Sequence, residues 1–270
     1  DGTCVTVPQI DRVTAGDGAP GNLITISGEG FGVDAGFVTF LGTESGDEVQ
    51  VSAYSCAGET AWEDGQIVVE VPDAAIDGPI EVTTVDSTGA ESDSERTDDD
   101  YGPHISDFDV NSIERPGLCS ITPSTGEGND AVEIAGNNLG SEIGSSALYF
   151  DYYEPSSYTT WSVTEIGAVT PLLDDGDYDV QVFAGDYYCE TSGSICSTDD
   201  DCDTTVSESC VTSWCSETLG ACADDDDCDT DEGSCESIRQ GSNEIDFYIS
   251  TTTSDAPPVI SYVDTGWSAC

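Results

Sequence analysis

The sequence has no lysine and no methionine, and among its 270 residues it has only four arginines and one histidine. Against these few cations stand 56 aspartates and glutamates, so the formal net charge is −52 at pH 7. Such a chain repels the phosphates of nucleic acids and the surface of anionic membranes. We therefore expect no nucleic-acid partner, and we expect self-repulsion that salt or divalent cations relieve.

The usual sequence signatures of catalysis are also missing. A hydrolase needs a nucleophile with a base and an orienting group, but the single histidine is His104 and no G-x-S-x-G motif occurs. No phosphate-binding loop or dinucleotide-binding fingerprint is present. A pair of carboxylates carries no information about glycoside hydrolysis in so acidic a chain. We expect the chain not to be an enzyme.

No apolar run approaches the length of a membrane-spanning helix, so we expect no membrane span. The cysteines number twelve, an even count, which is typical of a disulfide-bonded protein from an oxidising compartment. The first residues, DGTCV, are those of a mature form after signal-peptide removal. We therefore expect a secreted, extracellular or cell-surface protein.

One segment occurs twice. Residues 21–32 read GNLITISGEGFG, and residues 130–140 read DAVEIAGNNLG. In both copies alternating apolar residues lead into a glycine-rich turn, as in a strand with one buried face. Upstream residues match too, because Val13 precedes Gly28 by 15 positions and Ile121 precedes Gly136 by the same number. The agreement of two registers indicates an internal repeat.

This pattern resembles the IPT/TIG family of immunoglobulin-like domains. The first copy continues with FVTFLG at residues 37–42 and IVVEVPDA at residues 67–74, and the second with ALYFD at residues 147–151. The resemblance implies an all-β fold of two immunoglobulin-like β-sandwiches in tandem. It implies little about function, because such domains serve many proteins.

The repeat predicts the domain boundaries. We expect a first sandwich at residues 1–100, a linker or closing strand at 101–117, and a second sandwich at 118–250. A cysteine-rich insertion at 189–235 interrupts the second sandwich, and a tail follows at 251–270. Whether residues 105–110 close the first sandwich or only link the two is left open by their imperfect alternation.

The insertion is itself a tandem repeat. The first unit contains Cys189, Cys196, Cys202 and Cys210, and the second contains Cys215, Cys222, Cys228 and Cys235. Corresponding cysteines of the two units are separated by 26, 26, 26 and 25 residues. We expect two disulfides within each unit. A zinc site is a weaker hypothesis, because close C-x2-C pairs are missing. The acidic runs offer hard oxygen ligands for calcium, although a solvated acidic loop is the alternative. These ligands would be Asp199, Asp200, Asp201, Asp203, Asp224, Asp225, Asp226, Asp227 and Asp229.

The other four cysteines are Cys4, Cys56, Cys119 and Cys270. We expect Cys4 to pair with Cys56 in the first sandwich, and Cys119 to pair with Cys270 or across subunits. An end-to-end covalent link through Cys4 and Cys270 is the alternative.

The tail contains an apolar segment, PPVISYV, that is similar to the first strand of each sandwich. Too few residues follow it here to form a sandwich. It could pair with another copy of the chain, fold back on its own chain, or begin a third domain. Donation to the next copy would build a filament, because a head-to-tail contact does not close. The assembly residues would be Val259, Ile260, Tyr262 and Val263.

We therefore expect a structural subunit of an extracellular filament or surface layer, whose partners are copies of itself. The alternative is an adhesin or carbohydrate-binding module with glycan partners, which an exposed aromatic row on one sandwich face would favour. Aromatic residues that could form such a row, or could equally belong to the core, are Trp62, Tyr152, Tyr153, Tyr158, Trp161, Tyr187, Tyr188 and Trp267.

Overall fold

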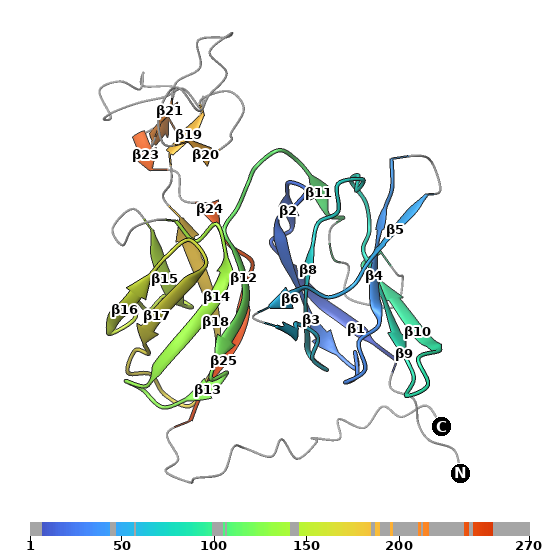
Figure 1. Cartoon of the computed structure of the whole chain (residues 1–270), viewed down its shortest axis with the longest axis horizontal. Helices are drawn as coiled ribbons and strands as arrows, with labels where there is room; N and C mark the ends of the chain where they lie inside the picture. The colour runs from blue at the N-terminus through green and yellow to red at the C-terminus, as the bar shows by residue number, and fades with distance from the viewer. Residues whose placement is uncertain are drawn as a thin grey trace.

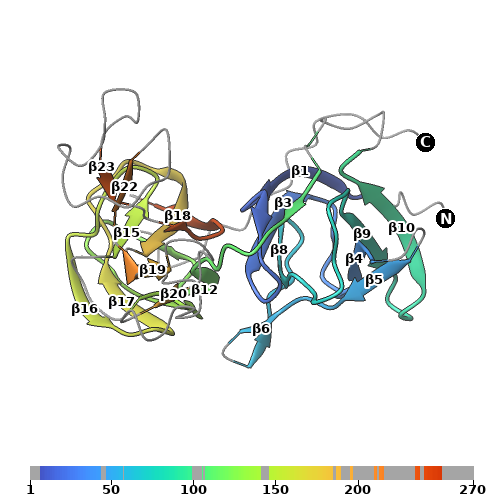
Figure 2. The same ribbon diagram turned by 90° about the horizontal axis from the view of Figure 1, so that it is seen from above.

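The computed structural model describes residues 7–43, 47–56, 58–98, 105, 107–140, 146–184, 187–189, 195–196, 210–211, 213–215, 235–237 and 240–250. All regular elements in this part of the chain are β-strands, which confirms the predicted all-β fold. Most of these strands form two β-sandwiches that lie side by side, and the others form small separate sheets (Figures 1 and 2). No helix in these residues is long and apolar enough to cross a membrane.

The first sandwich packs two antiparallel sheets face to face. One sheet has the order β1 (Gln9–Thr14), β3 (Leu23–Glu29) and β8 (Gln66–Glu70). The other has the order β10 (Glu91–Arg96), β9 (Glu81–Val85), β4 (Phe37–Leu41) and β5 (Glu48–Val51). Its core is made of branched aliphatic and aromatic side chains from both sheets, among them Ile24, Ile26, Phe40, Ile67 and Val82.

The second sandwich has a similar arrangement with further strands at the sheet edges. One sheet runs β12 (Gly117–Thr122), β14 (Ala131–Asn137), β17 (Glu165–Val169) and β16 (Ser157–Trp161). The other runs β13 (Thr125–Gly126), β25 (Ile245–Ile249), β18 (Gly176–Ala184) and β15 (Ala147–Phe150), with β24 (Gln240–Gly241) also on β18. Because Ala184 pairs with Gln240, residues 185–239 leave and re-enter this sheet at one point.

The duplicated glycine-rich turn has the same geometry in both sandwiches. Gly32 and Gly140 both have positive φ, at 75° and 80°, where a side chain would be strained. Behind each turn an indole Nε1 donates to the turn carbonyls, from Trp62 to Phe31 and Gly32, and from Trp161 to Leu139 and Gly140. The repeat seen in the sequence is therefore also a repeat of backbone conformation and hydrogen bonding.

Residues 108–110 contact elements of the first sandwich. Phe108 is buried and packs edge-on against Phe40, with 6.0 Å between ring centroids. β11 (Asp109–Val110) then pairs in parallel with β2 (Asp17–Gly18). This segment therefore packs on the first sandwich.

The two sandwiches share a covalent and apolar contact. Cys56, at the end of β6 (Ser55–Cys56), forms a disulfide with Cys119 on β12. Leu23 and Val68 of the first sandwich pack in the same cluster as Leu118 of the second. The expected pairing of Cys4 with Cys56 is therefore wrong, and so is that of Cys119 with Cys270. The partner of Cys56 is set by the packing of the sandwiches, which its own neighbours in the sequence do not reveal.

Candidate functional site

The candidate site lies on the outer face of the β13–β25–β18–β15 sheet. Along β18 the side chains of Val180, Val182 and Ala184 are buried in the core, so the alternate residues point outward. Asp179, Gln181 and Phe183 are these outward residues, and Tyr149 on β15 lies opposite Gln181. The outer face thus carries aromatic and hydrogen-bonding side chains side by side.

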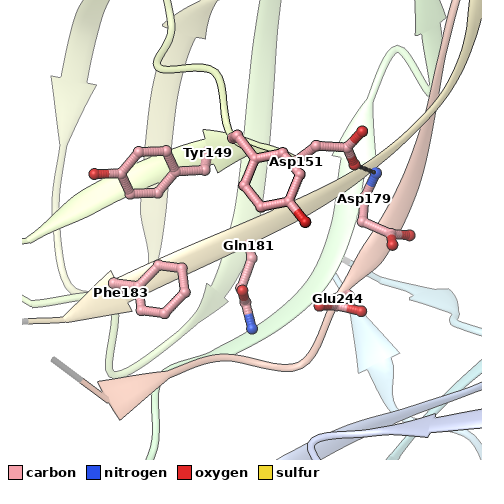
Figure 3. A pocket seen from close by; sticks show the side chains of 7 residues that line it. Tyr149, Asp151, Asp179, Gln181, Phe183 and Glu244 are labelled. Atoms are coloured by element: carbon pink, nitrogen blue, oxygen red, sulfur yellow. Dashed lines mark hydrogen bonds between the residues drawn. The ribbon is translucent and has the colours of Figure 1, made fainter.

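An open pocket of about 640 Å³ lies on this face (Figure 3). This volume is within the usual range for small-molecule sites. The lining combines three aromatic rings with three carboxyl groups and one amide: Tyr149, Asp151, Tyr152, Asp179, Gln181, Phe183 and Glu244.

The aromatic part of the pocket is partly fixed and partly exposed. Tyr149 and Phe183 pack edge to face, with ring centroids 5.7 Å apart and an angle of 80° between the rings. Tyr152 lies in the turn after β15, and its side chain is 92% exposed. The pocket therefore combines two aromatic rings that pack against each other with a third ring that is exposed to solvent.

The polar part is ordered by the backbone of neighbouring strands. Asp151 accepts a hydrogen bond from the backbone N–H of Asp179 at 2.8 Å. The side-chain amide of Gln181 donates to the backbone carbonyl of Ser242 at 2.8 Å. These bonds fix the carboxyl group of Asp151 and the amide of Gln181 at the edge of the aromatic rings.

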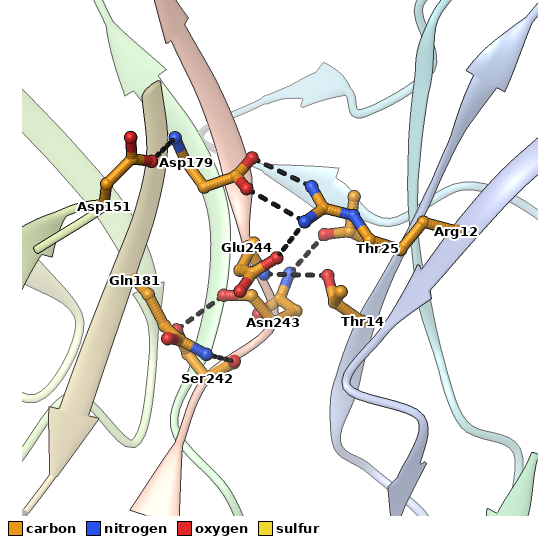
Figure 4. Close-up of polar contacts among 9 residues, drawn as sticks. All are labelled: Arg12, Thr14, Thr25, Asp151, Asp179, Gln181, Ser242, Asn243 and Glu244. Carbon is orange, nitrogen blue, oxygen red and sulfur yellow. Dashed lines mark hydrogen bonds and ion pairs between the residues drawn. The ribbon is translucent and has the colours of Figure 1, made fainter. Parts of the chain in front are cut away.

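Arg12, on β1 of the first sandwich, contacts two carboxyl groups of the pocket lining, those of Asp179 and Glu244 (Figure 4). Its guanidinium donates two hydrogen bonds to Asp179, at 2.9 and 2.8 Å, in the bidentate geometry that suits arginine and carboxylate. It also pairs with Glu244 at 2.7 Å. The hydrogen bonds that Arg12 donates to Asp179 raise the pKa of Arg12 in spite of its partial burial.

Two carboxyl groups near the junction, the place where the two sandwiches meet, have raised pKa values. Burial raises the pKa of Glu244, and the ion pair with Arg12 only partly opposes that effect. Burial also raises the pKa of Asp246, and the facing carboxylate of Asp179 adds to the shift. The ionised forms of Glu244 and Asp246 are therefore less favoured in the folded protein than in the unfolded chain.

Besides Arg12, Asn243 also connects the two sandwiches, and its side chain is fully buried. Its side chain accepts from the backbone N–H of Leu118 and donates to that residue's carbonyl, each at 2.7 Å. The same amide donates across the junction to the hydroxyl of Thr25 at 2.7 Å. Next to it, the backbone N–H of Glu244 donates to Thr14 at 3.1 Å. The pocket edge is thus bonded to both sandwiches.

The residues predicted from the sequence to bind calcium, Asp199 to Asp203 and Asp224 to Asp229, lie outside the described residues, as do the assembly residues of the tail. Within the residues that the structure describes, no group of three or more histidine, cysteine, aspartate or glutamate side chains could hold a metal ion. Cys4, Cys202, Cys222, Cys228 and Cys270 also lie outside.

In the cysteine-rich segment the structure describes short strands. β19 (Tyr187–Cys189) pairs with β20 (Ile195–Cys196) and β21 (Cys210–Val211), and β22 (Ser213–Cys215) pairs with β23 (Cys235–Ser237). The register sets Cys189 opposite Cys210 and Cys215 opposite Cys235.

Of the aromatic residues predicted as a sugar platform, one lines the pocket. Tyr152 is that residue, whereas Tyr153 is exposed outside it. Trp62 is buried, and Tyr158 packs against Trp161 beside the core of the second sandwich. The side chains of Tyr187 and Tyr188 and all of Trp267 lie outside the described residues.

Several pocket residues were missed in the sequence. Tyr149 and Phe183 occupy the outward positions of alternating strands, and that alternation was visible in ALYFD and DVQVFA. Nothing in the local sequence of Arg12, Asp179 or Glu244 shows that they meet, because 167 residues separate Arg12 from Asp179.

Comparison with known proteins supports the fold of the second sandwich. Residues 116–198 match the model of the IPT/TIG domain. A cyclomaltodextrin glucanotransferase from Niallia circulans is 42% identical over 73 residues, which is 27% of this chain and 9% of that enzyme. One from Bacillus sp. (strain 6.6.3) is 43% identical over 70 residues, or 26% of this chain and 8% of the enzyme. The chain thus spans about a tenth of the length of these relatives.

Some solved structures are similar to parts of this chain at low identity and with low TM-scores. The match with the extracellular region of plexin A4 spans 67% of this chain and 17% of the plexin chain, with 21% identity and a TM-score of 0.29. SGBP-B from a xyloglucan utilization locus of Bacteroides uniformis covers 66% of this chain and 46% of its own, with 16% identity and a TM-score of 0.25. These likenesses concern the fold alone. The expectation of a filament subunit receives no support from the comparisons, and residues 116–198 are similar to the IPT/TIG domain.

Proposed function

We propose that this chain is a non-catalytic carbohydrate-binding part of a secreted or cell-surface protein, and that the pocket on the second sandwich binds a glycan. The observation that carries the proposal is the pocket itself, in which Tyr149, Tyr152 and Phe183 lie beside Asp151 and Gln181. Sugars have apolar C–H faces that pack on aromatic rings and hydroxyl groups that bond to carboxylates and amides. The lining offers both kinds of contact within one open site.

The similarity to cyclomaltodextrin glucanotransferases supports the same class of ligand. Their name denotes carbohydrate chemistry, and the similar stretch is a small part of each enzyme. A stretch that recurs outside the enzymes fits a binding or supporting part better than a catalytic one. The absence of nucleophile and base signatures from the sequence agrees with a binding role.

The proposal is tested by affinity electrophoresis through gels that contain maltodextrin, xyloglucan or mixed-linkage glucan. The wild-type chain is expected to be retarded by at least one of these neutral polysaccharides. Tyr152→Ala removes an exposed ring and should weaken retention about tenfold, the effect of about 1.4 kcal/mol of lost contact.

Tyr153→Ala is the matched control, because Tyr153 is also an exposed tyrosine but does not line the pocket. It should migrate like the wild type. Retention that is unchanged in Tyr152→Ala, or lost equally in both variants, would place any glycan site elsewhere. Free migration of the wild type in every gel would contradict the proposal.

A further inference from the structure

The charge around the pocket is strongly one-sided. Its lining contains three carboxyl groups, those of Asp151, Asp179 and Glu244, and no arginine or lysine. Asp246 lies directly opposite Asp179 in the sheet, and its acidity responds to Asp177 and Glu63 as well. The Debye length is about 10 Å at ordinary salt, so the three carboxyl groups of the lining set the potential inside the pocket.

Arg12 is the cation at this edge, and its charge is directed to the protein. Both terminal nitrogens of the guanidinium face Asp179, and one of them also faces Glu244, at distances of 2.7 to 2.9 Å. The N–H groups that Arg12 donates to Asp179 are not available to a ligand carboxylate or sulfate, and the ion pair with Glu244 further offsets the guanidinium charge. The arrangement resembles the anion-binding use of arginine, but the anions are residues of the chain itself (Figure 4).

We infer that the pocket takes uncharged glycans and rejects those that carry carboxylate or sulfate groups, and that the pairing of Arg12 with Asp179 and Glu244 sets this selectivity. The inference rests on the proposed glycan-binding function. Hydroxyl groups of a neutral sugar donate to the carboxylates at the edge, whereas a uronic acid brings a further negative charge and finds no unpaired cation. The first sandwich thus contributes to specificity through one side chain, although the pocket lies on the second.

The test removes the two carboxylates and keeps the arginine. In the variant Asp179→Asn/Glu244→Gln, the amide oxygens can still accept from Arg12, but the guanidinium charge is no longer neutralised. Retention is measured in gels containing mixed-linkage glucan or maltodextrin and in gels containing polygalacturonate, at the same moderate salt. The wild type should be retarded at least tenfold less by polygalacturonate than by the neutral glucan to which the wild type binds. The double variant should gain at least tenfold in retention by polygalacturonate.

Two controls separate this local effect from the charge of the whole chain. Adding Arg12→Gln to the double variant should abolish the gain. Glu48→Gln/Glu70→Gln changes the net charge by the same amount at exposed positions of the first sandwich, and it should gain nothing. Circular dichroism checks that each variant is folded. If the double variant does not fold, Glu244→Gln alone replaces it and should show a smaller gain in retention by polygalacturonate.

The outcomes distinguish the two claims. A wild type that binds neutral glucan and polygalacturonate equally would overturn the selectivity and leave the glycan-binding function standing. A gain of equal size in Glu48→Gln/Glu70→Gln would overturn the role of Arg12, because total charge would then explain the preference. A wild type that no glycan of either kind retards would overturn both claims.

Discussion

Asn243 should be the most sensitive polar residue at the junction of the two sandwiches. Its side chain is fully buried and makes hydrogen bonds of 2.7 Å to the N–H and the carbonyl of Leu118 and to the hydroxyl of Thr25. Asn243→Ala removes all three and leaves both backbone groups of Leu118 buried without these partners. An unsatisfied buried group costs about 1–3 kcal/mol, so we expect the free energy of unfolding to fall by about 3–5 kcal/mol.

Urea denaturation at fixed high salt measures this effect. Guanidinium chloride is unsuitable because, as a salt, it screens the repulsion among the carboxylates of a chain with a net charge of −52. With a denaturant dependence of about 2 kcal/mol per molar urea, the midpoint should fall by about 2 M. The disulfides are kept oxidised throughout.

Thr25→Val gives the matched comparison, since it removes only the bond that crosses between the sandwiches. It should cost about 1 kcal/mol. Combined with Asn243→Ala it should cost little more than Asn243→Ala alone, because the bond is already absent. A loss below about 1 kcal/mol for Asn243→Ala, or full additivity of the two variants, would refute this account of the junction.

Three further predictions concern the disulfide, pH and salt. Replacing Cys56 and Cys119 together with alanine should lower the free energy of unfolding by about 2–4 kcal/mol, since the bond closes a loop with a sequence separation of 63; peptide mapping without reductant should recover the two cysteines in one linked fragment, and separate fragments would contradict the pairing. Because the pKa of Glu244 is raised above its ordinary value of 4.5 in the folded state, its contribution to stability is present below that value and is lost as pH rises through the folded pKa. Urea titrations from pH 4 to pH 7 should therefore move the stability difference in favour of Glu244→Gln as pH rises, and a shift the other way would show that the ion pair with Arg12 outweighs burial. The melting temperature should rise between 0.05 and about 1 M NaCl as the net charge of −52 is screened, and a flat response would show that self-repulsion does not limit stability.

The sequence by itself determined the strand pattern. Alternating apolar residues and the two glycine-rich turns predicted strands that the structure places at Leu23–Glu29 and Ala131–Asn137. This information is local, because the faces of a strand and the positive φ of a turn glycine depend on residues close in the chain. The same local pattern placed Val180 and Val182 inward and so turned Phe183 outward.

Only the tertiary structure decided which outward residues form a site. The pocket joins Tyr149 and Phe183 to Glu244, and it brings Arg12 across 167 residues to Asp179. The disulfide between Cys56 and Cys119 likewise depends on how one sandwich packs against the other. Such contacts follow from long-range packing of two cores, and neither hydrophobic periodicity nor cysteine spacing carries that information.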